Sequence, residues 1–81
     1  MFMEYIETAM KQAKYKTLED KTYFGEVPGF RGVWANEKSR EECRKILQEV
    51  LEGWVLLKVR QGDKLPTIHG KRLKLPNLVH A

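Results

Sequence analysis

A long, capped helix in the second half of the chain constrains the fold more than any other feature of the sequence. The stretch Ser39-Arg40-Glu41-Glu42 fits the capping box, in which the Ser39 hydroxyl and the Glu42 carboxylate satisfy each other's backbone amides at a helix start. Gly62 is a common residue type just after a helix end. Between these ends apolar residues recur at helical spacing, at Cys43, Ile46, Leu47, Val50, Leu51, Trp54 and Leu57. The pattern predicts a helix from Ser39 to Gly62.

The apolar stripe of this helix widens toward its C-terminal end. Val55 and Leu56 join Trp54 and Leu57 there, as in a helix that is covered on two sides. A chain of 81 residues buries only about 60% of its unfolded surface and gains stability from self-association. We therefore expect a second subunit to supply the second cover, in a homodimer or a higher homo-oligomer.

The rest of the chain predicts one more helix and several short strands. Apolar residues at helical spacing predict a helix from Phe2 to Ala13. Residues 15–18, 22–27 and 32–35 are rich in strand-forming types and are separated by turn residues, which predicts a three-stranded meander. Residues 71–75 alternate basic with apolar side chains and predict a final strand. We expect one α+β domain over residues 1–81, in the order helix, three antiparallel strands, long helix and strand.

The sequence offers no recognisable catalytic or metal site. Residue types that could act as acid, base or nucleophile are Glu19, Asp20, Glu26, Ser39, Cys43, His69 and His80. None of them forms a known constellation, and Cys43 lies on the apolar stripe, where a thiol usually packs as a small hydrophobic side chain. A single cysteine and two separated histidines do not build a zinc site. We expect no catalytic residue, no metal and no cofactor, and therefore not an enzyme.

The aromatic residues indicate an exposed face on the sheet. Neighbours on a strand point to opposite faces, so Tyr23 and Phe24 separate, as do Val33 and Trp34. One helix covers only one face, which leaves an aromatic side chain for the first helix, a second subunit or another partner to cover. The candidate interface residues are Phe24, Trp34, Trp54, Val55 and Leu56. For Trp54 the alternative is a core position, which its place on the apolar stripe favours.

Positive charge is concentrated near the C-terminus. The chain carries a formal net charge of +4, and residues 58–81 hold six basic side chains against Asp63 alone. The candidate phosphate contacts are Lys58, Arg60, Lys64, Lys71, Arg72 and Lys74. With Trp34 or Phe24 as a stacking platform, they make a nucleic-acid-binding module the alternative function.

Membrane insertion and export are not indicated. The longest uncharged apolar run, from Trp54 to Leu57, is far shorter than the roughly 20 residues of a spanning helix. The first residues include Glu4 and Glu7, unlike the basic start and apolar block of a signal peptide. We expect a cytoplasmic protein without a membrane partner.

One segment resembles a known family. The stretch TYFGEVPGFRGVWANEKSREECRKILQEVLEGWV is similar to the HicB antitoxin family, whose pattern is an aromatic-rich strand, a turn with proline and glycine, another strand, and a helix that opens Thr/Ser-x-Glu-Glu. The resemblance covers about residues 15–62. Arg31 stands where a proline is usual, and Glu37 stands where glycine is frequent. The matching positions are Tyr23, Pro28, Phe30, Gly32, Ala35, Ser39, Glu41 and Glu42.

The resemblance implies a fold and a function. It implies a partial ribonuclease-H-like βββαβ arrangement without the acidic cluster of the nuclease. Members of the family are non-enzymatic antitoxins that bind and block HicA, a small ribonuclease toxin that cleaves messenger RNA. We therefore expect a HicB-like interaction module that neutralises a HicA-type toxin and acts as a homo-oligomer.

Overall fold

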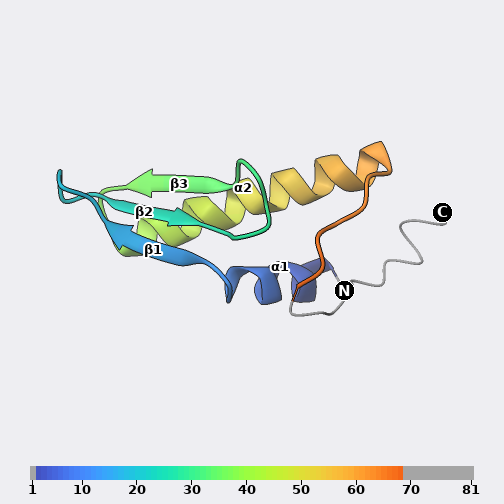
Figure 1. The fold of residues 1–81 in the computed structure, drawn as a ribbon, viewed down its shortest axis with the longest axis horizontal. Coiled ribbons are helices and arrows are strands. Elements are labelled where there is room, and N and C mark those ends of the chain that lie inside the picture. Colours follow the sequence, from blue (N-terminus) through green and yellow to red (C-terminus); the bar gives the residue numbers. More distant parts are fainter. Residues whose placement is uncertain (1, 69–81) are drawn as a thin grey trace.

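A three-stranded antiparallel sheet lies against one long helix (Figure 1). The computed structural model describes residues 2–68. The elements are α1 (Phe2–Met10), β1 (Lys14–Thr17), β2 (Tyr23–Glu26), β3 (Trp34–Glu37) and α2 (Arg40–Gln61), and the strand order is β1-β2-β3. The predicted α+β class and the meander are confirmed. The strand expected at 71–75 lies outside the described residues.

Both ends of α2 are capped within the chain. The Ser39 hydroxyl oxygen accepts a hydrogen bond from the Glu42 amide at 3.0 Å, and the hydroxyl donates to the Glu42 carboxylate at 3.3 Å. The carboxylate thus binds the hydroxyl, whereas a capping box has it bind the Ser39 amide. Gly62 takes a left-handed φ of 77°, and the amides of Gly62 and Asp63 donate to the carbonyls of Val59 and Lys58. This Schellman pattern ends the helix where the sequence predicted.

The turns set the strand boundaries. Between β2 and β3 the Val27 amide donates to the Val33 carbonyl, and the Phe30 amide donates to the Val27 carbonyl. These bonds make residues 27–33 a closed loop, with Gly29 and Gly32 at positive φ, so β3 begins at Trp34 and not at the predicted Gly32. The side chains of Val27, Phe30 and Val33 are buried. The loop therefore adds to the core as well as reversing the chain.

The core follows the inner stripe of α2. Cys43, Leu47, Leu51 and Val55 are fully buried. The N-terminal half of α2 packs on the sheet, and α1 lies alongside the end of α2 that extends past the sheet (Figure 1). Because Val55 is fully buried within the single chain, it does not need the cover that we expected from another subunit.

Helix α1 is shorter than predicted, and a hydrogen bond links it to the segment that follows α2. The amides of Gln12 and Ala13 donate to the carbonyls of Ala9 and Met10, three residues back, which tightens the end of the helix after Met10 instead of at Ala13. The Tyr5 hydroxyl donates to the Pro66 carbonyl at 2.6 Å. This bond holds the segment that follows α2 against α1.

We predict that Gly25→Ala destabilises the protein. A Cβ atom at Gly25 would lie 2.9 Å from the Tyr15 ring and 3.1 Å from the Cys43 sulfur, closer than van der Waals contact permits. Overpacking of this kind typically costs about 1–3 kcal/mol, measurable by urea unfolding. In the double variant Gly25→Ala/Tyr15→Ala the combined loss should be smaller than the sum of the two single losses, because Tyr15→Ala removes the main clash. Strict additivity would contradict this explanation.

We predict that Tyr5 makes stability fall in alkali. Burial raises the pKa of the Tyr5 hydroxyl to about 12, whereas an unfolded tyrosine ionises near 10. Between these values the unfolded chain loses the proton and the folded chain keeps it, so the free energy of unfolding decreases as the pH rises. Tyr5→Phe should flatten this decrease in urea unfolding measured at several pH values. An unchanged slope would show that Tyr5 does not cause it.

Candidate interaction surfaces

The residues that the sequence suggested as one interface lie in separate places. Phe24 and Trp34 lie on the face of the sheet that points away from α2, and Leu56 is half exposed on α2. Trp54 packs against the loop between β2 and β3. Val55 is fully buried, so our expectation that it faces a partner is corrected: other core side chains of the same chain already cover it.

Two stacked aromatic rings dominate the exposed face of the sheet. The ring centroids of Phe24 and Trp34 are 5.9 Å apart with an interplanar angle of 22°, and Trp34 is 55% exposed. The Lys16 ammonium lies 5.5 Å from the Phe24 centroid, in a cation–π contact. We call the set of side chains on this face, Lys14, Lys16, Phe24, Glu26, Trp34 and Asn36, the outer sheet surface.

Strand register builds the outer sheet surface. Phe24 pairs with Lys16 on one side and with Asn36 on the other. Trp34 is two residues from Asn36, so it is the diagonal neighbour of Phe24, a position from which aromatic rings reach each other. The Asn36 amide group donates to the Thr22 hydroxyl and to the Tyr23 carbonyl, both at 2.9 Å, which fixes the polar end of the surface.

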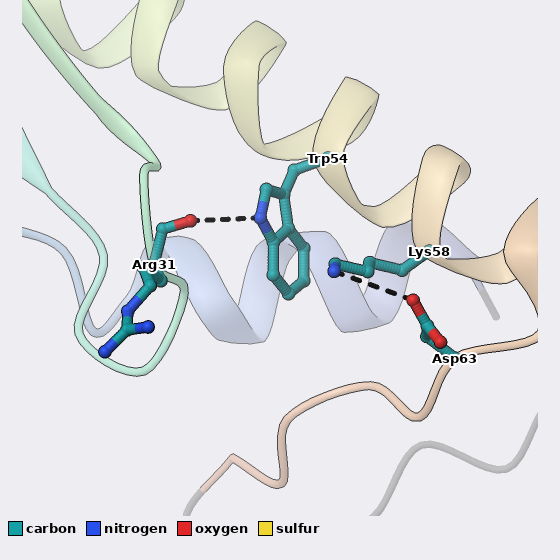
Figure 2. A network of polar contacts seen from close by, with 4 residues as sticks. All are labelled: Arg31, Trp54, Lys58 and Asp63. Atoms are coloured by element: carbon teal, nitrogen blue, oxygen red, sulfur yellow. Dashed lines mark hydrogen bonds and ion pairs between the residues drawn. The ribbon is translucent and has the colours of Figure 1, made fainter.

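Trp54 connects α2 to the loop between β2 and β3 (Figure 2). Its indole N–H donates to the Arg31 carbonyl at 3.1 Å, and its ring meets Phe30 edge-on, with centroids 5.2 Å apart. The Lys58 ammonium lies 5.3 Å from the indole centroid and 3.6 Å from an Asp63 carboxylate oxygen. Trp54 is therefore tied to its own chain by its indole N–H and by the contacts of its ring with Phe30 and Lys58.

The basic residues are only partly placed. Lys58 is engaged by Trp54 and Asp63, whereas Arg60 and Lys64 are exposed. Lys71, Arg72 and Lys74 lie outside the described residues. The described part of the chain thus contains half of the suggested phosphate-binding stripe.

The candidate chemical groups have structural roles or are unplaced. Asp20 accepts hydrogen bonds from the Thr22 amide and hydroxyl, which lower the pKa of its carboxyl and close the turn between β1 and β2. Burial raises the pKa of the Cys43 thiol, and a protonated thiol is a poor nucleophile. His69 and His80 lie outside the described residues. Within residues 2–68, no three histidine, cysteine or acidic residues are grouped so that they could hold a metal ion.

Comparison with known proteins assigns the family. Residues 4–66 match the UPF0150-like family. The chain belongs to the UPF0150-like family. This family is HicB-like, so the resemblance seen in the sequence is confirmed at that level. No protein of curated function matches the chain.

A solved structure resembles this UPF0150-like protein in both fold and sequence. The crystal structure of TTHA0281 from Thermus thermophilus superimposes with a TM-score of 0.84. The two chains share 40% sequence identity over 91% of this chain and 93% of the other. Among residues 2–68, no helix combines the length and the apolar character that a membrane span needs.

The structure places at exposed surfaces three residues that were not among the candidate site residues from the sequence. Lys16 lies next to Phe24 on the outer sheet surface, and its position follows from the register of β1 with β2. The two-residue alternation of strands could have placed Lys16 on the same face as Phe24, once β1 and β2 were aligned as a hairpin. Gly53 and Leu57 lie exposed on α2. Helical spacing assigned Leu57 to the same stripe as the buried residues, because the spacing does not tell which of two adjacent stripes faces the core.

We predict that Trp54→Ala weakens the fold of the single chain. It removes the bond to Arg31 and the contact with Phe30, and it should lower the free energy of unfolding by about 2–4 kcal/mol. Because these contacts lie within one chain, the loss should be the same at low and at high protein concentration. Trp54→Phe, which keeps a ring but loses the N–H, should cost only about 1 kcal/mol. A loss that grows with protein concentration would instead identify Trp54 as a subunit contact.

Proposed function

We propose that this UPF0150-like protein is a non-enzymatic antitoxin module that binds and neutralises a HicA-type toxin, a ribonuclease that cleaves messenger RNA. The family assignment supports this proposal, because the family is HicB-like. The observation that carries it is the stacked pair of Phe24 and Trp34 on a sheet face that no element of residues 2–68 covers. A protein that acts on a cytoplasmic ribonuclease would itself be cytoplasmic.

The aromatic pair has the properties of a protein-binding anchor. Large aromatic rings are enriched among the residues that contribute most to protein–protein affinity. Phe24 holds the Trp34 ring by stacking and is held in turn by Lys16, so little side-chain freedom is left to lose on binding. Asn36 and Glu26 provide polar neighbours of the kind found at the rim of an interface.

Charge indicates how this surface would bind a toxin. A toxin that grips RNA needs a basic surface. The outer sheet surface carries Lys14 and Lys16 against Glu26, so it does not attract such a surface by net charge. Binding would therefore rely on burial of the aromatic rings, and the affinity should depend weakly on salt.

The second candidate is binding of single-stranded nucleic acid. Phe24 and Trp34 flanked by Lys16 also resemble a platform on which unpaired bases stack, with the exposed Arg60 and Lys64 as candidate phosphate contacts. This function makes the opposite prediction about salt, since phosphate contacts weaken steeply as salt increases. Salt dependence therefore discriminates between the two candidates.

We predict that Trp34→Ala weakens binding to the toxin at least tenfold. The probe is a HicA-type protein encoded in the same genome, in an inactive form, and the dissociation constant is measured by calorimetry. The loss follows from the removal of an exposed aromatic anchor. Met3→Ala, which shortens another half-exposed apolar side chain on α1, is the matched control and should leave the affinity unchanged.

The same titration separates the candidates. Toxin binding that changes little between low and moderate salt and is lost in Trp34→Ala supports the antitoxin proposal. Failure to bind any HicA-type protein of that genome contradicts it. Salt-sensitive binding of a single-stranded RNA oligonucleotide, weakened by Trp34→Ala, would establish the nucleic-acid module in its place.

A further inference from the structure

Helix α2 carries a second apolar stripe beside the one that fills the core. Ile46, Val50, Gly53 and Leu57 follow one another at intervals of four, three and four residues. This is the spacing of a seam between two paired helices. Ile46 and Val50 are half buried, whereas Gly53 is exposed and Leu57 is 53% exposed. The stripe thus leaves the core and continues onto the surface, with the half-exposed Leu56 beside it.

Gly53 is an unusual residue at the middle of this stripe. A glycine inside a helix destabilises it by roughly 1 kcal/mol relative to alanine. No atom lies within 4 Å of the place where a Cβ would be, so packing within the chain does not require a glycine. Glycine at an exposed helix position does allow the backbone of another helix to approach closely.

The charges beside the stripe are arranged for an antiparallel partner. Arg60 lies seven residues after Gly53, and Glu49 lies four residues before it on the same side of α2. If two copies of α2 cross in opposite directions at Gly53, Arg60 of one copy lies opposite Ile46 of the other. In that other copy Glu42 and Glu49 lie one turn to either side of Ile46, so the arginine comes close to two carboxylates. A parallel crossing would instead place arginine beside arginine and glutamate beside glutamate. The charges of two α2 helices are therefore complementary in the antiparallel orientation and not in the parallel one.

We propose that a second copy of this chain docks on the second stripe of α2, giving a two-fold dimer in which the two helices cross antiparallel at Gly53. Leu57 and Leu56 fill the sides of the crossing, and Arg60 of each subunit pairs with Glu49 of its partner. The proposal does not depend on toxin binding, because the sheet lies between α2 and the outer sheet surface of Phe24 and Trp34.

Sedimentation equilibrium of the full chain over a range of concentrations tests this dimer. The wild-type protein should be dimeric, and Leu57→Glu should raise the dimer dissociation constant at least tenfold, because it places two carboxylates in the seam. Met3→Glu also introduces a carboxylate in place of a half-exposed apolar side chain, on α1, and should leave the dimer intact. Circular dichroism of Leu57→Glu should show an unchanged helix content, since Leu57 is not a core residue.

Charge reversal tests the orientation. Arg60→Glu should weaken the dimer, and the double variant Arg60→Glu/Glu49→Arg should restore it. A wild-type monomer at every concentration, a dimer that survives Leu57→Glu, or a double variant as weak as Arg60→Glu would each overturn the proposal. The monomeric Leu57→Glu variant should still bind the HicA-type toxin if the antitoxin proposal is correct, so the two proposals fail separately.

Discussion

Burial of one stripe of α2 organises the rest of the structure. Cys43, Leu47, Leu51 and Val55 recur every four residues and are all fully buried. Because an α-helix has 3.6 residues per turn, each step of four moves the stripe by about 40° around the helix, or about 120° from the first residue to the last. A flat layer cannot follow such a rotation from Cys43 to Val55. The sheet covers the start of the stripe, where the Cys43 thiol donates to the Ala35 carbonyl, and α1 packs against α2 beyond the sheet (Figure 1).

This rotation explains which parts of the fold were predictable from the sequence. The ends of α2 depend on local contacts of Ser39 and Gly62, and they were predicted to within one residue. The identity of the second cover was not, because helical spacing shows that a face is apolar but not what lies on it. Val55 was therefore assigned to a subunit contact, although core side chains of the same chain bury it. The start of β3 differs from the prediction for a similar reason. The closed loop from Val27 to Val33 is held by backbone hydrogen bonds that a residue pattern does not predict.

The outer sheet surface and the place of Trp54 were also predictable only where local sequence determines them. Alternation along a strand was enough to predict that Trp34 lies on a face that the long helix does not cover, and Trp34 is exposed there. The stacking of Trp34 on Phe24 depends on the register of β2 with β3, which the length of the intervening loop sets. Trp54 was left between core and interface, and its bond to Arg31 joins residues 23 positions apart. Such a contact depends on the tertiary fold and not on local sequence.

The two proposed surfaces are compatible because of the layer between them. In each subunit the sheet separates α2 from Phe24 and Trp34, so a dimer that closes through α2 leaves both outer sheet surfaces open. In the proposed dimer the two-fold axis would pass through the crossing of the helices and would direct the two outer sheet surfaces away from each other. One dimer could then bind two toxin molecules without contact between them. Antitoxin and toxin would assemble in equal numbers, with one toxin on each aromatic pair.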